Sequence, residues 1–318
     1  MQKRRLGRTG PEVPAIVLGG NVYGWTLDEV GSFHQLDRAV AEGLNFIDTA
    51  DVYSRWVPGH EGGESETILG KWFAKSGRRK NVFLATKAGI DMGEGKSGLS
   101  PRYIAEAIDA SLRRLQTDYI DLYQAHTDDA DTPLEETLGA FDTLVRAGKV
   151  RYIGASNYGG ARLAQALEIS RANGLASYIS LQPHYNLVER QPFESDQLPV
   201  VEKYGLGAIP YFSLASGFLT GKYRRGADAS QSARAAFVEK YRNDCGYAIV
   251  DALLEIARAH NATPAQVALA WLVAQPGVTA PIASATNGNQ LDDLIAAADL
   301  KLDEASLQKL SEVSQPAV

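Results

Sequence analysis

Eight short apolar runs, each followed by a segment of helical periodicity, constrain the fold of this chain more than any other feature. Short apolar runs bounded by turn signals are typical of buried strands, and regular alternation of strand and helix favours a parallel sheet. Eight alternations favour a closed (β/α)8 TIM barrel over an open doubly wound sheet, which usually has fewer strands. The predicted strands are 15–19, 45–48, 82–87, 120–124, 150–154, 178–182, 206–211 and 278–282.

Capping signals place the ends of two helices between these strands. Ser100 and Pro101 precede an apolar stripe at helical spacing, which is an N-cap followed by proline in the first turn. Thr132 and Pro133 open the next helix in the same way, and Gly148 is expected to end it as a C-cap.

A hairpin and one long loop complete the predicted architecture. The hairpin covers 4–13, with its turn near Gly10 and Pro11, and precedes the first strand. No linker-like change in composition interrupts the pattern, so we interpret residues 1–318 as a single domain, a length that one barrel can occupy. A long insertion after strand 7, 215–243, is rich in Lys and Arg. Loops at this position often bind phosphate, and a solvated basic loop is the alternative.

Charge and cysteine content exclude several classes of function. The net charge is −6, whereas a general nucleic-acid binder needs a basic face, so no nucleic-acid partner is expected. Cys245 is the single cysteine and cannot form an internal disulfide, which indicates a reducing, cytoplasmic compartment. No stretch approaches the ~18 apolar residues of a membrane span, and the basic N-terminus lacks the apolar core of a secretory signal. No membrane partner is therefore expected.

Polar residues end three of the predicted strands, where catalytic groups of parallel α/β proteins gather. Asp48 ends the second strand, Lys87 ends the third and His126 follows the fourth, while Tyr53 lies just beyond Asp48. An unperturbed phenol has a pKa of about 10 and donates its proton reluctantly at neutral pH. The Lys87 ammonium would lower the pKa of Tyr53, and Asp48 would keep Lys87 charged and fixed. His126 could orient a carbonyl oxygen, so the set suits proton donation to an oxygen that has just accepted a hydride.

Each of these residues also has an ordinary structural interpretation. Asp48 could cap a helix or form a buried ion pair, Lys87 could be a structural partner in such a pair, and His126 could be a core histidine. Their joint occurrence at successive strand ends favours one catalytic pocket.

These stretches resemble the aldo-keto reductases, a family of (β/α)8 barrels that use NAD(P)H, and the resemblance covers the whole chain. The segment 46–53 is similar to the family's Asp-Thr-Ala-x-x-Tyr signature, 85–87 to its strand-3 lysine and 124–126 to its strand-4 histidine. The resemblance implies an oxidoreductase that reduces an aldehyde or ketone by hydride transfer from NAD(P)H. Tyr53 would be the general acid, assisted by the other three strand-end residues.

The resemblance also implies a cofactor site along the later strands. Ser156 and Asn157 lie in a Gly-x-Ser-Asn element and, with Gln182, would bind the nicotinamide carboxamide, while Tyr211 would stack on the nicotinamide ring. The segment 213–222 is similar to a family segment that ends Gly-x-Leu-Thr-Gly-Lys, whose backbone amides and lysine face the pyrophosphate. The implied contacts there are Ser213, Leu214, Ser216, Gly217 and Lys222.

The segment after the last strand departs from many NADPH-dependent members, which place Lys or Arg there to pair with the 2′-phosphate. This chain offers Ser284, Thr286 and Gln290, whose hydroxyl and amide groups bind phosphate less decisively than arginine does. Arg234 or Lys222 could substitute. Family habit favours NADP, and NAD or use of both cofactors stays open.

Loops after the first two strands carry further candidate site residues. Gly20 and Asn21 would permit close approach of the nicotinamide. Tyr23, Trp25 and Trp56 could wall a substrate pocket or simply pack over the barrel mouth, and we favour the pocket because an exposed tryptophan needs a reason.

Two features are given no chemical role. His184 is interpreted as a bystander. The acidic stretch 128–131 is explained by capping of the helix that follows, so no metal site is predicted.

Two other functions fit part of the pattern. A Schiff-base lyase could use Lys87 as its nucleophile, but that chemistry needs a partly neutral amine and Asp48 would keep Lys87 charged. A regulatory subunit that binds the nicotinamide cofactor and turns over slowly is the second alternative, since some members of the family associate with channels.

Overall fold

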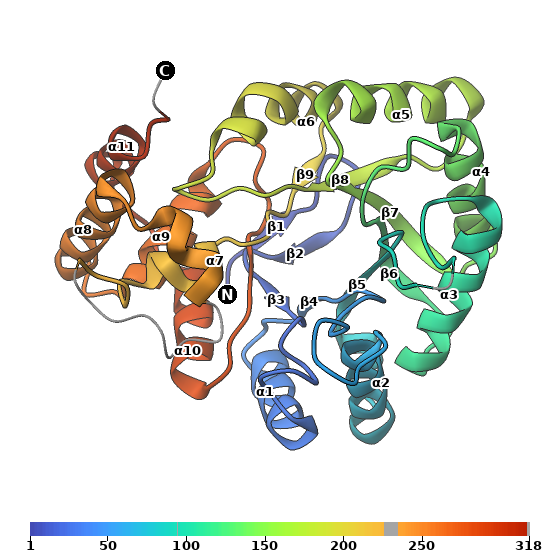
Figure 1. Ribbon diagram of the computed structural model, residues 1–318, viewed down its shortest axis with the longest axis horizontal. Helices are drawn as coiled ribbons and strands as arrows, with labels where there is room; N and C mark the ends of the chain where they lie inside the picture. Colours follow the sequence, from blue (N-terminus) through green and yellow to red (C-terminus); the bar gives the residue numbers. More distant parts are fainter. Residues whose placement is uncertain (94, 226–234, 317–318) are drawn as a thin grey trace.

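The computed structural model describes residues 1–93, 95–225 and 235–316, and its centre is a parallel sheet. The strands of this sheet are β3 (Val17–Gly19), β4 (Phe46–Asp48), β5 (Phe83–Ala88), β6 (Ile120–Ala125), β7 (Val150–Ser156), β8 (Tyr178–Gln182), β9 (Gly207–Ala208) and β10 (Ile282–Ala283). They pair in the order β10-β3-β4-β5-β6-β7-β8-β9. Figure 1 shows the helices arranged as a ring around these strands.

The sheet closes into a barrel where its first and last strands meet. Ile282 of β10 lies opposite Val17 of β3. Val278 forms a parallel bridge with Ala208 of β9, and the amide of Ile282 donates to the Pro210 carbonyl at 2.8 Å. These contacts join the two edges of the sheet, and the predicted (β/α)8 barrel is confirmed.

An antiparallel hairpin of β1 (Lys3–Arg5) and β2 (Glu12–Pro14) closes one end of the barrel, as the sequence predicts. Leu6 and Val13 of this hairpin are fully buried and share an apolar cluster with residues of the barrel strands. The amide of Arg8 donates to the Gly205 carbonyl, which precedes β9, so the hairpin covers the amino-terminal end. The carboxyl ends of the strands are left for a site.

Most helices pack around the barrel with one apolar face buried. The bounds of the helices are α1 (Glu29–Ala41), α2 (Glu64–Ser76), α3 (Pro101–Leu115), α4 (Leu134–Arg146), α5 (Gly160–Asn173), α6 (Leu198–Tyr204), α7 (Ala235–Val238), α8 (Asp244–Ala259), α9 (Pro264–Ala274), α10 (Gly288–Ala297) and α11 (Glu304–Val313), with 3-10 segments η1 (Arg79–Asn81), η3 (Ala215–Thr220) and η4 (Glu239–Tyr241) and a π-helical segment η2 (Phe193–Gln197). Helix α9 is buried on nearly all sides, and α11 packs against α8 and α9.

Helix ends agree with the sequence at α3 and differ at α4. The Ser100 side chain accepts from the amide of Tyr103 and caps α3, as predicted. Thr132 does not cap α4, because its hydroxyl donates to Asp129 and Pro133 occupies the N-cap position without a side-chain bond. Gly148 follows the end of α4 with a φ of +73°, the left-handed conformation expected of it.

The last two strands are shorter than predicted. The sequence predicts strands over 206–211 and 278–282, whereas β9 and β10 each span two residues. Pro210 and Pro281 explain the difference, because a proline has no N–H to donate to the ladder.

Candidate active site

A buried ion pair joins the carboxyl ends of β4 and β5. Lys87 Nζ lies 2.7 Å from Asp48 Oδ2 and donates to the Thr49 carbonyl at 2.7 Å. Lys87 is fully buried and Asp48 is 1% exposed. Burial lowers the pKa of Lys87. The charge and hydrogen bond of Asp48 raise the pKa by a larger amount, so it lies above its ordinary value. The amine is therefore charged at neutral pH.

The second oxygen of Asp48 is held by two glutamine side chains. Gln182 Nε2 donates to Asp48 Oδ1 at 2.9 Å, and Gln124 Nε2 donates to the same oxygen at 3.2 Å. Both glutamines are buried. Asp48 is thus fixed from three strands, β5, β6 and β8, which orients the Lys87 ammonium.

The phenol of Tyr53 lies on the other side of the ammonium. Tyr53 follows β4, and its hydroxyl lies 3.2 Å from Lys87 Nζ. Burial raises the pKa of Tyr53, and Lys87 offsets only part of that rise. The net lowering expected from the sequence is therefore not found. A raised pKa keeps the phenol protonated at neutral pH, which is the state that a proton donor needs.

His126 lies beside Tyr53 at the end of β6. The centroids of the two rings are 6.1 Å apart. Burial, followed by the charge of Lys87, holds the pKa of His126 well below its ordinary value. A neutral imidazole can donate one hydrogen bond to a substrate oxygen without adding a second positive charge to the site.

The residues expected to bind nicotinamide form a connected group next to His126. Asn157 Nδ2 donates to the His126 carbonyl at 2.9 Å and to Ser156 Oγ at 3.1 Å. The Tyr211 hydroxyl donates to Asn157 Oδ1 at 2.9 Å. Ser156 Oγ donates to the carbonyl of Gln182, whose amide is directed at the ion pair. The structure therefore brings these four residues together with the strand-end cluster.

The loop after β9 has an unusual backbone conformation, and two of its amides are already engaged: Ala215 N donates to the Phe212 carbonyl at 2.7 Å and Gly217 N to the Leu214 carbonyl at 2.8 Å. Ala215, Ser216 and Gly217 are successive residues with positive φ, at +47°, +57° and +93°. A Cβ at Gly217 would lie 3.2 Å from Nζ of Lys222, so the lysine amine stands directly over the glycine. Lys222 is exposed.

The other expected residues of this loop have structural partners or lie outside the described residues. Ser213 is buried, and its hydroxyl donates to the Pro210 carbonyl at 3.0 Å. Leu214 packs against the apolar core. Arg234 falls outside the described residues.

The segment after β10 holds its polar groups in internal hydrogen bonds. Ser284 Oγ donates to Asn21 Oδ1 at 2.5 Å. The amide and hydroxyl of Thr286 both donate to Gln290 Oε1, at 2.8 and 3.0 Å. Asn21 is thus tied to the β10 loop. Gly20 lies where a Cβ would come within 3.0 Å of the Asp48 carbonyl, so the close approach there is made by the protein backbone.

Two of the three aromatic residues expected at the mouth lie around Tyr53. Trp56 packs against the Tyr53 ring and against Trp25, with centroid distances of 5.6 Å in both pairs. Trp56 is 46% exposed. Tyr23 is fully buried and its hydroxyl donates to Gln35, a placement in the core that does not support its assignment to the pocket.

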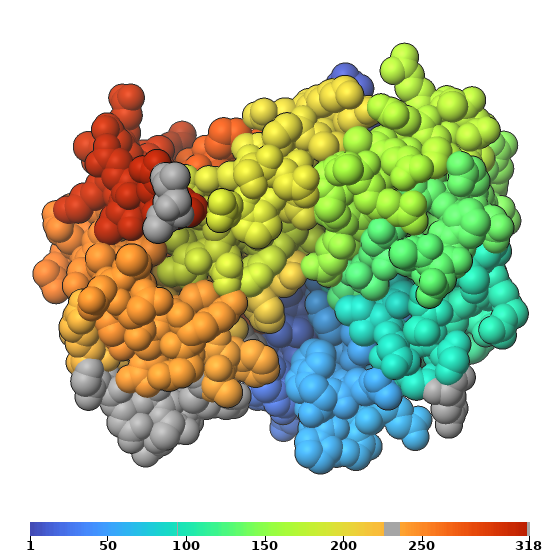
Figure 2. Space-filling view, turned by 45° about the horizontal axis from the view of Figure 1, so that its top comes forward, coloured from blue at the N-terminus to red at the C-terminus, as the bar shows by residue number. Residues whose placement is uncertain are grey.

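The space-filling view shows a hollow where the blue N-terminal segments meet the yellow and orange ones (Figure 2).

His184 has a closer relation to the cofactor residues than the sequence indicated. Its ring stacks on Tyr211 with a centroid distance of 5.2 Å and an interplanar angle of 19°. The histidine therefore supports one face of the ring that is expected to contact nicotinamide.

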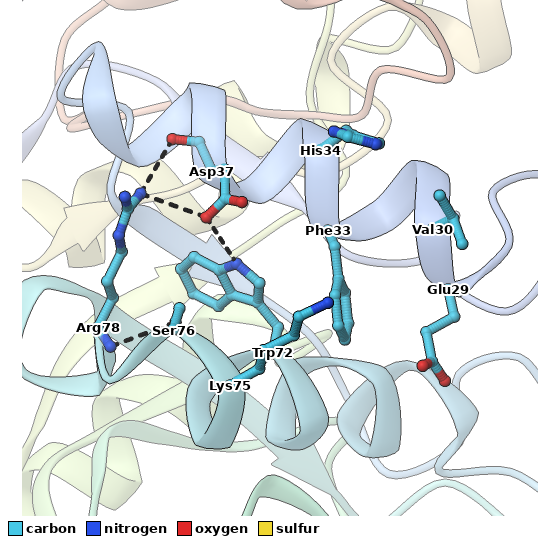
Figure 3. Close-up of a pocket in the computed structure, with 9 residues that line it drawn as sticks. All are labelled: Glu29, Val30, Phe33, His34, Asp37, Trp72, Lys75, Ser76 and Arg78. Carbon is cyan, nitrogen blue, oxygen red and sulfur yellow. Dashed lines mark hydrogen bonds and ion pairs between the residues drawn. The ribbon is translucent and has the colours of Figure 1, made fainter.

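A separate cavity of about 390 Å³ lies between α1 and α2 on the outside of the barrel (Figure 3). Figure 3 shows Trp72 and Phe33 there beside the charged groups of Asp37, Lys75 and Arg78. None of the residues that line this cavity belongs to the strand-end cluster.

The residues that the structure describes contain neither a membrane-spanning helix nor a metal-binding cluster. No helix there has both the length and the apolar character needed to cross a membrane. Within the same residues, no group of three or more His, Cys, Asp or Glu side chains could hold a metal ion.

Sequence reasoning missed two groups that fix the ion pair. Gln124 and the Thr49 carbonyl both contact it, and neither was assigned a role. A signal for Gln124 exists in the sequence, because it is an amide two residues before His126 and so on the same face of the strand. A backbone carbonyl carries no such signal.

Comparison with known proteins places the chain among reductases. Residues 15–315 match the Aldo/keto reductase family. The chain is 38% identical to "Uncharacterized oxidoreductase YrpG" of Bacillus subtilis (strain 168), over 98% of this chain and 96% of that protein. It is 34% identical to "Probable voltage-gated potassium channel subunit beta" of Oryza sativa subsp. japonica, over 94% and 92%. It is 33% identical to "Versiconal hemiacetal acetate reductase" of Aspergillus parasiticus, over 99% and 98%.

Proposed function

The chain belongs to the aldo/keto reductase family and is an oxidoreductase, and on this premise we propose that it reduces an aldehyde or ketone to the alcohol with NAD(P)H. Tyr53 acts as the general acid, and Lys87, Asp48 and His126 assist it. The single observation that carries the proposal is the position of Lys87 Nζ, within 2.7 Å of Asp48 and 3.2 Å of Tyr53.

The residues on the later strands fit a nicotinamide dinucleotide. Asn157 is exposed, Tyr211 is partly exposed, and a hydrogen bond joins them. Together they place an amide beside an aromatic ring. The exposed Lys222 amine, which lies beside Gly217, supplies a cation for the pyrophosphate. When bound, the cofactor supplies the hydride that reduces the carbonyl carbon.

The protein's own residues supply the proton and hold the reacting oxygen. The phenol of Tyr53 donates its proton to the oxygen, and the ammonium of Lys87 stabilises the phenolate that results. Neutral His126 donates a hydrogen bond to the same oxygen and fixes its direction. Asp48, held by Gln124 and Gln182, keeps the ammonium in place.

Lys87 is charged and engaged, which argues against Schiff-base chemistry. A lysine nucleophile must lose its proton, whereas the pair with Asp48 and the bond to Tyr53 favour the ammonium. Borohydride trapping with a carbonyl substrate should give no covalent adduct at Lys87.

A cofactor-dependent absorbance assay tests the proposed function. We expect consumption of NADPH with at least some members of a panel of aldehydes, ketones and sugars. Bound cofactor without turnover across the panel would overturn the proposal.

NADPH is the proposed cofactor over NADH, on the family resemblance alone. Thr286 and Gln290 are engaged with one another and would have to rearrange or share their hydrogen bonds with a 2′-phosphate. Parallel titrations should give the higher kcat/KM with NADPH, and a higher kcat/KM with NADH would reverse this assignment.

A second candidate function is supported by relatives that are named as potassium channel subunits. The relative from Oryza sativa is named as a potassium channel subunit, and its match to this chain covers 92% of its length. A cofactor-binding regulatory subunit is therefore the alternative function for this chain. Steady-state turnover separates the two, because a regulatory subunit would bind NADPH and turn over slowly with every carbonyl tested.

A further inference from the structure

One buried carboxyl next to the catalytic group has no role in the reaction described above. Asp51 lies in the loop between β4 and Tyr53, and it is 1% exposed. Its amide donates to the Lys87 carbonyl at 3.1 Å, so its backbone is attached to β5. Neither carboxyl oxygen has a hydrogen-bond partner among the residues that the structure describes.

A second buried carboxyl beside it has a complete set of partners. Glu66 of α2 is fully buried. Arg114 Nε donates to Glu66 Oε2 at 2.7 Å, and the hydroxyl of Thr86 donates to Glu66 Oε1 at 2.6 Å. Thr86 is the neighbour of Lys87 in β5, so the Glu66–Arg114 pair is bonded to the strand that holds Lys87.

A count of charges leaves Asp51 without a cation. The carboxyls here are Asp48, Asp51 and Glu66, and the cations are Lys87 and Arg114. Lys87 is bonded to Asp48 and Arg114 to Glu66, so both cations are already paired with other carboxylates. An ionised Asp51 would be a buried charge with no counter-ion of its own and no side-chain hydrogen bond, which is a costly state.

The electrostatic surroundings of Asp51 agree with this count. Burial first, and the charge of Glu66 second, raise the pKa of Asp51 to about 8, although Arg114, the backbone amide of Val52 and Lys87 oppose the rise. The other titratable groups that sense its charge are Tyr53, Tyr103 of α3 and Tyr123 of β6. All three are phenols, which add no positive charge.

We propose that Asp51 keeps its proton in the working enzyme. Because Asp51 is then neutral, no negative charge from it opposes Tyr53 when Tyr53 donates its own proton. Asp51 is then a positioning residue for the acid strength of Tyr53, and this role rests on the proposed function. Once Asp51 ionises, its charge opposes formation of the Tyr53 phenolate, so Tyr53 becomes a weaker acid.

The first experiment is the pH dependence of single-turnover NADPH oxidation, which follows the chemical step. The wild type should lose roughly twofold to threefold in rate through a step near the pKa of Asp51, about 8. Asp51→Asn removes the titrating group at nearly constant shape, so the step should be absent. Asp118→Asn, which neutralises an exposed carboxylate, is the matched control and should keep the step.

A second readout needs no turnover. Because the native state holds the proton of Asp51 more tightly than the unfolded chain does, its contribution to stability is lost as pH rises from 3.8 to about 8. Denaturant unfolding should therefore show that the free energy of unfolding falls more steeply with pH in the wild type than in Asp51→Asn. The difference in slope should correspond to up to about one proton bound differently by the native and unfolded states.

The two readouts separate failure of this inference from failure of the proposed function. A wild type without turnover would overturn the function, and the stability slopes would still report the proton on Asp51. A step near pH 8 that persists in folded Asp51→Asn, or identical stability slopes, would overturn the role of Asp51. If Asp51→Asn does not fold, Glu66→Gln should move the step to lower pH, and an unmoved step would be equally decisive.

Discussion

Two arcs of the barrel differ in how they are built. The arc from β5 to β8 consists of strands of five to seven residues in parallel ladders, with one register shift between Ile153 and Gly154 of β7. The arc of β9 and β10 has two residues per strand, and the loop after β9 has three successive positive φ values. The proposed chemical groups lie on or beside the first arc, and the proposed pyrophosphate contacts lie on the second. Substitutions of the chemical groups and of the pyrophosphate contacts should therefore change different kinetic constants.

The largest effect should come from the first arc, at Lys87. Lys87→Met removes the ammonium that stabilises the Tyr53 phenolate, so kcat should fall by roughly 10³-fold or more. It also leaves Asp48 as a buried charge without its cation, which should cost about 3–5 kcal/mol of stability. Activity and melting temperature should be measured together. A folded variant that keeps its activity would show that the ammonium is not part of proton transfer.

Tyr53→Phe should give the next largest effect and should separate the arcs most clearly. Loss of the general acid should lower kcat by roughly 10²-fold to 10⁴-fold, while NADPH affinity stays nearly unchanged because the cofactor contacts lie on other strands. Fluorescence titration with NADPH and stopped-flow hydride transfer measure the two quantities. Parallel loss of both would make Tyr53 structural, and an unchanged kcat would give the acid role to His126.

In the second arc, Gly217→Ala should raise the Kd for NADPH and leave the chemical step intact. The φ of +93° disfavours a side chain, and the added Cβ would contact the Lys222 amine at 3.2 Å. We expect the free loop to relax away from this conformation, so that regaining it on binding costs about 1–2 kcal/mol, or roughly tenfold in Kd. The single-turnover rate at saturating NADPH should match the wild type, and a slower rate there would mean that the loop acts on the chemistry.

The smallest effect is expected from a glycine outside both arcs. Gly139 lies within α4, and a Cβ there would meet no atom within 4 Å. Gly139→Ala should stabilise the protein by about 0.5–1 kcal/mol and change neither kcat nor Kd. It is the matched control for Gly217→Ala, and denaturant unfolding measures it. Destabilisation would indicate that α4 packs differently from the structure described.

The two arcs were also predictable to different degrees. Apolar runs ending in polar residues placed Lys87 and His126 correctly at strand ends, because a long buried strand leaves a clear pattern in the sequence. The strands at 206–211 and 278–282 were predicted too long, since apolar residues continue through prolines that interrupt the ladder. Sequence alone could not show that Tyr23 faces the core, because loop side chains follow no fixed period.

The net electrostatics of the site were the least predictable part. The relay of Asp48, Lys87 and Tyr53 was expected to lower the pKa of the phenol, whereas burial outweighs the ammonium. Desolvation depends on what covers a side chain, and residues far apart in the sequence provide that cover. Asp51 escaped notice for the same reason, since only the structure shows which carboxyls hold the two cations.

Closure of the barrel has a consequence during synthesis. The sheet is completed by pairing of β10 with β3, two strands that are about 265 residues apart, so a nascent chain cannot complete its barrel until residue 283 has left the ribosome. Until then β3 and β9 are unpaired edges of the sheet, and such edges can pair with other chains. Folding on the ribosome should therefore depend on protection of these edges, and slow translation after β9 should increase aggregation more than slow translation before β5.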